Sequence, residues 1–349
     1  MVDISKAKID SACMHYIGNK NREEGIKLSS HPLLIDSSLE EILVKYFLSP
    51  FKQNELYNFY HDTNLNFNEA YNYVSEIFSR NECLFEQSVN LAKHLYKQSS
   101  HPQIKNGEFY IVNFKNCILD NEIVDAVGLF KSENKDTFLK IYSKNENFEI
   151  KSEEGININK LDKGCLIFNM ESENGYLITI VDNTNKSVGN QAQYWIDSFL
   201  QIKRHNDSYF QTQQMLDLCK KFSDEEFPLH DNASKVNQAD FLTKSISFLK
   251  DNSHFNAEEF EKKIFQGTKT TENFQEYKKQ YEISNQIQLP DEFDISNTAV
   301  KKQAKTYQSL IKLDNNFHIY VHGDTALIQN GIDESTGMKF YRFLYNEER

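Results

Sequence analysis

The hydrophobic period of this chain changes along its length, and that change limits the folds available to it. From residue 39 to residue 97, apolar residues recur at helical spacing, and helices are expected from about residue 39, over 68–79 and over 85–97. Between residues 107 and 182, short β-branched and aromatic runs alternate with polar turns, which is typical of antiparallel strands. The pattern predicts an α+β protein with a helical N-terminal segment followed by a central antiparallel β-meander.

Helical spacing returns after residue 193 and predicts a mainly helical C-terminal part. The candidate helices are residues 194–202, 209–222, 238–250, 257–265 and 272–281. Ser296 is expected to cap a further helix that runs to Ile311. The runs NFHIYVHG, ALIQNG and MKFYRFLY then predict strands of a small closing β-sheet, with Gly337 in a turn.

The change from strand to helix pattern near residues 188–191 is the best candidate for a domain boundary. It predicts an N-terminal α+β domain over residues 1–190 and a C-terminal helical domain with terminal strands over residues 191–349. The chain has no run of 18 apolar residues and no secretory leader pattern at its start, so we expect a cytoplasmic protein that does not span a membrane. Its five cysteines lack close pairs, so we expect reduced, mostly buried thiols.

Sequence motifs of common enzymes are absent from this chain. It contains no G-x-G-x-x-G, no P-loop, no H-E-x-x-H and no G-x-S-x-G, and we expect no cofactor. His318 and His322 fall on one face of a predicted strand. A metal site there would need Asp314 or Asp324 as a further ligand. The alternative to a metal site is an ordinary polar strand face, which is what we expect.

A weak nuclease pattern occurs in the predicted meander. Asp136 and the Glu149-x-Lys151 pair match the acid plus Glu-x-Lys arrangement in which carboxylates hold magnesium and lysine orients the attacking water. The same residue types also occur in an ordinary exposed hairpin. A magnesium-dependent nuclease is therefore a distant alternative.

The charge balance argues against a generally basic surface. The chain has 39 Lys and Arg against 51 Asp and Glu, a formal net charge of −12, so any site for a polyanion must be local. The clearest basic segment is 296–313, which has four lysines and no acidic residue. In a helix, Val300, Ala304, Tyr307 and Ile311 would share one face, while a separate side would carry Lys301, Lys302, Lys305 and Lys312.

A second stretch without acidic residues, 87–107, precedes the predicted meander. It carries Lys93, Lys97 and Lys105 and would extend a phosphate-binding patch, or it would simply be a solvated surface. Lysines without base-reading arginines or asparagines predict little sequence preference.

Several blocks of the chain together resemble one known family. The blocks are YFLSPFK from Tyr46, NLAKHLYKQSSHPQIKNGEFYIV from Asn90, GLFKSENKDTFLKIY from Gly128, GININKLDKGCLIFN from Gly155, YWIDSFL from Tyr194 and KLDNNFHIYVHG from Lys312. Their order and content resemble the bacterial nucleoid-associated protein family of the NdpA/YejK type, in a form like that of Bacteroidetes. The resemblance implies a cytoplasmic, nucleoid-located protein that binds double-stranded DNA without marked sequence specificity and is not an enzyme.

The acidic net charge leaves a second hypothesis open. The protein would then reach the nucleoid as an adaptor, with no DNA affinity of its own, by docking its acidic surface to a basic nucleoid protein. RNA in place of DNA, and a homodimer that aligns several lysine patches, also stay open at this point.

Overall fold

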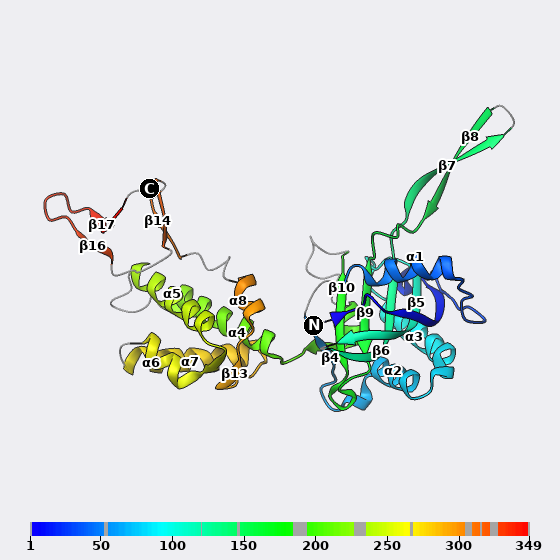
Figure 1. Cartoon of the computed structure of the whole chain (residues 1–349), viewed down its shortest axis with the longest axis horizontal. Helices are drawn as coiled ribbons and strands as arrows, with labels where there is room; N and C mark the ends of the chain where they lie inside the picture. Colours follow the sequence, from blue (N-terminus) through cyan, green and yellow to red (C-terminus); the bar gives the residue numbers. More distant parts are fainter. Residues whose placement is uncertain are drawn as a thin grey trace. The chain divides into compact units, whose positions relative to one another are not determined.

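The computed structural model describes residues 2–51, 55–119, 121–144, 147–183, 194–226, 235–265, 268–303, 309–314, 316–321 and 327–347. The chain divides into two compact units, Met1–His205 and Asn206–Arg349 (Figure 1). A large antiparallel sheet with helices forms the first unit, and helices with small hairpins form the second. The predicted α+β class is confirmed.

The first unit is built on one antiparallel sheet whose strand order is β11-β4-β10-β9-β6-β5-β2-β3. The central strands of this sheet are largely buried on both faces. The bounds are β1 Val2–Asp3 (paired with β5), β2 Lys8–Ile17, β3 Ile26–Lys27, β4 Tyr57–Phe59, β5 Gly107–Leu119, β6 Glu122–Ser132, β9 Lys163–Phe168, β10 Leu177–Asp182 and β11 Ile202–Arg204.

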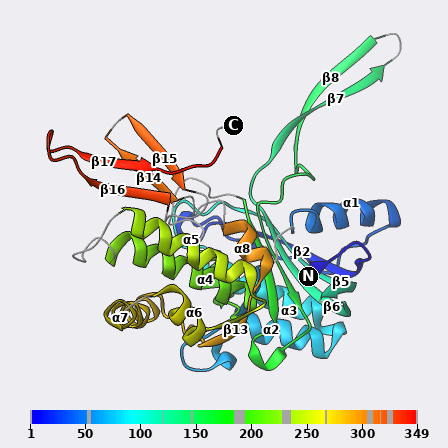
Figure 2. The same ribbon diagram turned by 60° about the vertical axis from the view of Figure 1, so that its left-hand side comes forward.

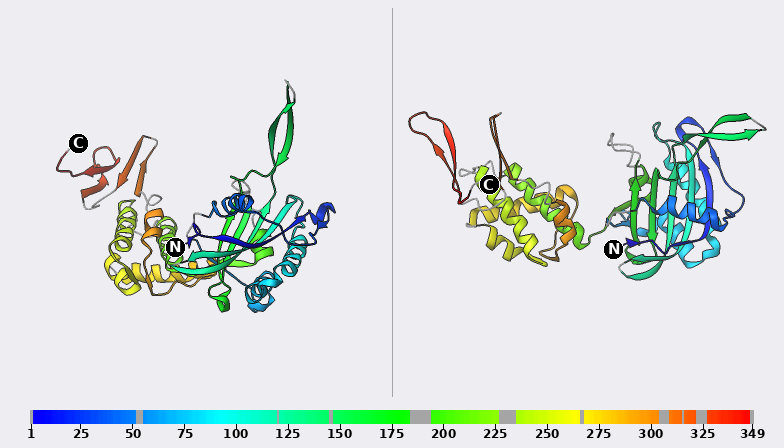
Figure 3. Two further views of the ribbon diagram at one scale, coloured as in Figure 1. Left: turned by 45° about the vertical axis from the view of Figure 1, so that its right-hand side comes forward. Right: turned by 45° about the horizontal axis from the view of Figure 1, so that its top comes forward.

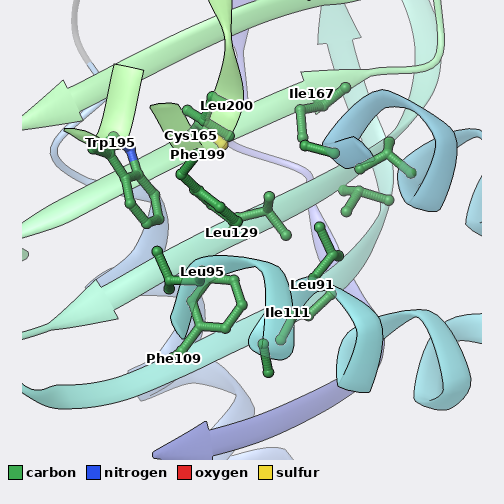
Figure 4. Close-up of a cluster of buried hydrophobic side chains, with 14 of the residues drawn as sticks. Leu91, Leu95, Phe109, Ile111, Leu129, Cys165, Ile167, Trp195, Phe199 and Leu200 are labelled. Atoms are coloured by element: carbon green, nitrogen blue, oxygen red, sulfur yellow. The ribbon is translucent and has the colours of Figure 1, made fainter. Parts of the chain in front are cut away.

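Side chains of these strands alternate between two buried clusters. On β5, Phe109 and Ile111 belong to the cluster under α2 (Glu69–Ser79) and α3 (Leu84–Gln98), whereas Tyr110 and Val112 belong to the cluster under α1 (Ser37–Leu48). Figure 3 shows these helices on the two sides of the sheet, and Figure 4 shows Leu91 and Leu95 of α3 facing the strands. The three predicted N-terminal helices are confirmed.

Two segments of the first unit depart from the sequence expectation. Strand β2 lies in a segment for which no strand was predicted, and both its faces carry mixed polar and apolar residues; the buried His15, for example, has its Nε2 2.9 Å from Ser88 Oγ. The segment predicted as a helix over 194–202 is a π-helical turn, η5 (Tyr194–Leu200), followed by β11. Trp195, Phe199 and Leu200 are buried in the cluster under α2 and α3, so this segment completes the first unit.

The predicted meander contains one departure from the sheet. Strands β7 (Asp136–Lys144) and β8 (Asn147–Gly155) pair with each other, outside the main sheet, and extend away from the rest of the unit (Figure 1). We call these two strands the arm. The strands on either side of the arm, β6 and β9, pair directly with each other.

The second unit is a helical bundle (Figure 2). Its core is rich in phenylalanine and includes Phe222, Phe241, Phe248 and Phe260. Its elements are α4 Ser208–Lys221, the π-helical turn η6 Phe222–Glu226, α5 Lys235–Asp251, β12 His254–Asn256, α6 Ala257–Ile264, α7 Thr268–Asn285, β13 Glu292–Asp294 and α8 Asn297–Gln303. β12 and β13 pair across the base of the bundle.

Small β-structure follows the bundle, as predicted. β14 (Ser309–Leu313) pairs with β15 (Phe317–Val321), and β16 (Ile328–Ile332) pairs with β17 (Lys339–Phe343). Gly337 has φ 70° in the turn between β16 and β17, where its backbone N–H donates to Asp333 O at 2.7 Å. All five cysteines are buried and free, which agrees with the sequence analysis.

Candidate nucleic-acid interface

The lysines predicted to contact DNA in the second unit begin on α8. Ser296 Oγ accepts the backbone N–H of Ala299 at 3.4 Å and so caps this helix. Ala299 and Val300 are buried, whereas Lys301 and Lys302 are exposed. The buried Ala299 and Val300 anchor this short helix, and the neighbouring Lys301 and Lys302 side chains face solvent.

The prediction that this helix continues to Ile311 is wrong. The described part of the helix is Asn297–Gln303, and residues 309–313 form β14, in which Ile311 pairs with Ile319 and Lys312 with His318. Pairing with the β-branched and aromatic residues of β15 outweighs the helical period there. The four lysines therefore do not share one helical face: Lys312 is on a strand, and Lys305 lies outside the described residues.

An aromatic ring supports one of the α8 lysines. Lys302 Nζ lies 5.8 Å from the ring centroid of Tyr209 on α4, within range of a cation–π interaction. This contact holds the ammonium group near the bundle surface and leaves its positive charge in place.

The three lysines predicted in the first unit are exposed but differ in their surroundings. Lys93 and Lys97 lie one turn apart on α3, and Lys97 Nζ is 3.8 Å from Glu69 Oε1. Lys105 Nζ donates to Asn134 Oδ1 at 2.6 Å. Glu69 offsets part of the positive charge, so this lysine set is weaker than its sequence suggests.

The sequence analysis missed one basic site, at the end of the main sheet. Lys6 and Lys8, with Asn116, Ile118 and Ile123, line a hollow of about 400 Å³. Lys8 pairs in register with Lys115, whose Nζ is 2.6 Å from Asp125 Oδ2. The K-x-K spacing at Lys6 and Lys8 was the available signal, with Lys6 in the turn that leads into β2 and Lys8 at the first position of that strand.

The residues of the nuclease hypothesis are not brought together. Asp136 pairs with Gly155, while Glu149 pairs with Tyr142, six residues further along β8. At roughly 3.3 Å per residue, these positions are about 20 Å apart. Asp136 accepts instead from Asn157 Nδ2 at 2.7 Å and from Lys160 Nζ at 3.0 Å, and these bonds lower its pKa. Glu149 and Lys151 share one face of the arm at a distance from Asp136.

The structure describes only half of the histidine site considered above. His318 lies on β15 and Asp314 follows β14, whereas His322 and Asp324 lie outside the described residues. Over the described part of the chain, no three His, Cys, Asp or Glu side chains gather closely enough to hold a metal ion. Among the described helices, none has the length and apolar character needed to cross a membrane.

Fold and surface together define an α+β protein of two units that presents lysines from helices and a sheet end. The sequence model of the NA37 family, described as nucleoid-associated protein YejK, matches residues 13–337. The chain belongs to this family, and membership assigns it to the nucleoid-associated proteins of the bacterial cytoplasm. The search of curated proteins found no match.

Proposed function

We propose that this protein binds double-stranded DNA without marked sequence preference and has no enzymatic activity. The observation that supports the proposal best is α8, which buries Ala299 and Val300 and exposes Lys301 and Lys302. The proposal also includes Lys305 and Lys312, which follow Lys301 within eleven residues along the chain. Family membership supports a role at the nucleoid.

The acidic net charge of −12 does not argue against DNA binding at a local group of exposed lysines. DNA binding depends on how many cations reach phosphates at the contact and on the counterions that they release, more than on the charge of the whole protein. Elsewhere in the second unit, lysines are already paired: Lys220 with Asp224 and Lys221 with Asp217, each at 3.0 Å. Such pairs leave little net positive field at those two positions.

A pair of variants with equal net charge tests the site. We would titrate a labelled random duplex of about 30 bp with each protein and follow fluorescence anisotropy at low salt. Lys301→Gln/Lys302→Gln should weaken binding at least about tenfold, since each lost phosphate contact removes a counterion-release contribution. Lys220→Gln/Lys221→Gln removes the same charge from paired positions and should bind nearly as wild type. Equal loss in both variants would overturn the assignment of the site.

The lysines of the first unit are proposed as a secondary contact. Lys93→Gln/Lys97→Gln/Lys105→Gln should reduce affinity less than the α8 variant does, because Glu69 offsets part of their charge. Competition of the labelled duplex with unlabelled double-stranded RNA of equal length distinguishes DNA from RNA, since phosphate contacts alone do not.

A partner-recruited adaptor is the second candidate, supported by a different surface. A hollow of about 950 Å³ in the second unit is lined by acids from three elements, including Glu258, Glu261, Glu282 and Glu292. Lys278, also in its lining, is paired with Asp291 at 2.9 Å. Such a surface suits a basic protein segment. This candidate predicts no duplex binding at low salt, and binding of a polylysine peptide that is lost in Glu258→Gln/Glu261→Gln.

A further inference from the structure

The arm has two chemically different faces. Its register places Leu139 opposite Ser152, Ile141 opposite Ile150, and Ser143 opposite Phe148 on one face. On the other face, Lys140 lies opposite Lys151, and Tyr142 lies opposite Glu149. We call the first the apolar face and the second the charged face of the arm.

Large side chains on the apolar face are open to solvent. The exposed fractions are 73% for Leu139, 65% for Ile141, 76% for Phe148 and 66% for Ile150. The charged face satisfies its own groups: Tyr142 Oη donates to Glu153 Oε1 at 2.9 Å, and Lys140 Nζ lies 3.4 Å from Glu153 Oε2. Four contiguous exposed hydrophobic residues on one side of a two-stranded hairpin mark an interaction surface.

The base of the arm is fixed to the main sheet. Asp162 Oδ2 accepts the backbone N–H groups of Glu133 and Asn134 at 2.6 and 2.9 Å, and Asp162 Oδ1 accepts from Asn134 Nδ2 at 2.6 Å. These bonds join the residues that enter the arm to those that follow it. The apolar face is therefore presented by an anchored base, and Figure 1 shows the arm extending from it.

The pattern of the apolar face indicates what covers it. A two-fold rotation about the Ile141–Ile150 pair exchanges Leu139 with Phe148 and Ser143 with Ser152, so that apolar positions map onto apolar positions and serines onto serines. The four apolar side chains therefore form one patch with the serines at two opposite corners, and a second copy offers an apolar patch of the same size. The apolar face carries no charge between Leu139 and Ser143, which makes it a poor surface for DNA and a good one for its own copy.

The available area is also adequate for pairing of two copies. At the exposures above, the four side chains offer about 500 Å² per chain, or about 1,000 Å² for two chains, which reaches the size of the smaller specific interfaces. A two-stranded hairpin is marginal alone in water, and packing against a second hairpin supplies the layer that it lacks.

We propose that two copies of this protein associate through the apolar faces of their arms. The isologous contact centres on Ile141 and Ile150 of each chain. This inference does not depend on DNA binding, because it concerns the protein alone. Where DNA binding also holds, the dimer joins two lysine patches in one particle and so raises the avidity for a long duplex.

Sedimentation equilibrium of the full chain without DNA, from about 1 to 100 μM, tests the proposal. Wild type should approach twice the mass of one chain. Ile141→Lys/Ile150→Lys and Ile141→Glu/Ile150→Glu should each associate at least about a hundredfold more weakly, because like charges then face each other. An equimolar mixture of the two variants should restore the dimer.

A matched control changes the opposite face by the same net charge. Glu149→Gln/Glu153→Gln should dimerise as wild type does. Circular dichroism should show that all variants keep the wild-type fold, since Ile141, Ile150 and Glu153 are solvent-exposed and Glu149 is only half-buried. The proposal is overturned if wild type stays monomeric over the whole range, if the lysine variant dimerises as well as wild type, or if the mixture remains monomeric.

Discussion

Lys131 Nζ lies 3.0 Å from Glu133 Oε1, and the two side chains are 0% and 5% exposed. The hydroxyl of Tyr194 donates to the same carboxylate oxygen at 2.9 Å, and Lys131 Nζ lies 3.2 Å from that hydroxyl. Burial raises the pKa of Tyr194 and lowers that of Lys131. This buried network joins the end of β6, where the chain enters the arm, to Tyr194 at the start of η5.

Removal of one partner from this network should be costly. Lys131→Met keeps most of the side-chain volume but leaves the Glu133 carboxylate buried without its cation, and we expect a loss of about 3–5 kcal/mol in the free energy of unfolding. Urea denaturation followed by circular dichroism measures it. Lys131→Met/Glu133→Gln should recover part of the loss. A cost below about 1 kcal/mol for the single variant would contradict this description of the network.

Asn68 should be a second point of high sensitivity, because one buried amide holds three segments together. Its Oδ1 caps α2 by accepting the N–H of Tyr71 at 2.9 Å, and its Nδ2 lies 2.9–3.0 Å from the carbonyl oxygens of Tyr60, Leu200 and Gln201. Asn68→Ala should cost about 2–4 kcal/mol in a urea titration, compared with about 1 kcal/mol for the exposed cap variant Asp36→Ala.

The variant Asn68→Asp separates the two roles of this side chain. Aspartate keeps the cap but turns a donor into an acceptor that faces three carbonyl oxygens. It should therefore be at least as destabilising as alanine at pH 7. Wild-type stability in Asn68→Asp would show that the cap alone matters.

Buried thiols should make the protein sensitive to alkali. Burial raises the pKa of Cys117, in the first unit, and that of Cys219, in the second, from 9.0 to about 12. A raised folded-state pKa means that the unfolded chain loses its proton first, so the stabilisation is complete below pH 9 and falls as pH rises toward 12. Urea midpoints between pH 7 and pH 11 should decline above pH 9. The decline should be shallower in Cys219→Ala, and a midpoint that stays constant to pH 11 would be inconsistent with buried neutral thiols.

Much of the architecture could be predicted because helix caps, helical periods and β-branched runs are each contained within a short stretch of sequence. Asp36 and Asn68 precede apolar helical periods and cap α1 and α2, and the β-branched runs of residues 107–182 form strands. Strand β2 was missed because both its faces mix polar and apolar residues, so its sequence lacks the alternation of a half-buried strand. Trp195 is buried in the cluster under α2 and α3 through contacts with residues far away in the sequence, and hydrophobic periodicity does not reveal such contacts.

The candidate sites were less predictable for the same physical reason. The lysines of residues 301–312 have helical spacing, but cross-strand pairing of Ile311 with Ile319 decides the local structure. The distance between Asp136 and Glu149 follows from the register of the arm, which the composition of FEIKSEE does not fix. The described site lysines, Lys93, Lys97, Lys105, Lys301 and Lys302, are exposed. Their acidic neighbours, such as Glu69 beside Lys97, come from other parts of the chain, which the local sequence does not report.

The salt dependence of duplex binding tests the central claim most directly. For four lysines that contact phosphates, the plot of log Kobs against log salt concentration should have a slope of about −3 to −4 for wild type. In Lys301→Gln/Lys302→Gln/Lys305→Gln/Lys312→Gln, affinity should fall, and the slope should shrink to the smaller value that the first-unit lysines contribute. A slope that is the same in both proteins, or no binding by wild type at low salt, would contradict the proposal that these lysines bind DNA.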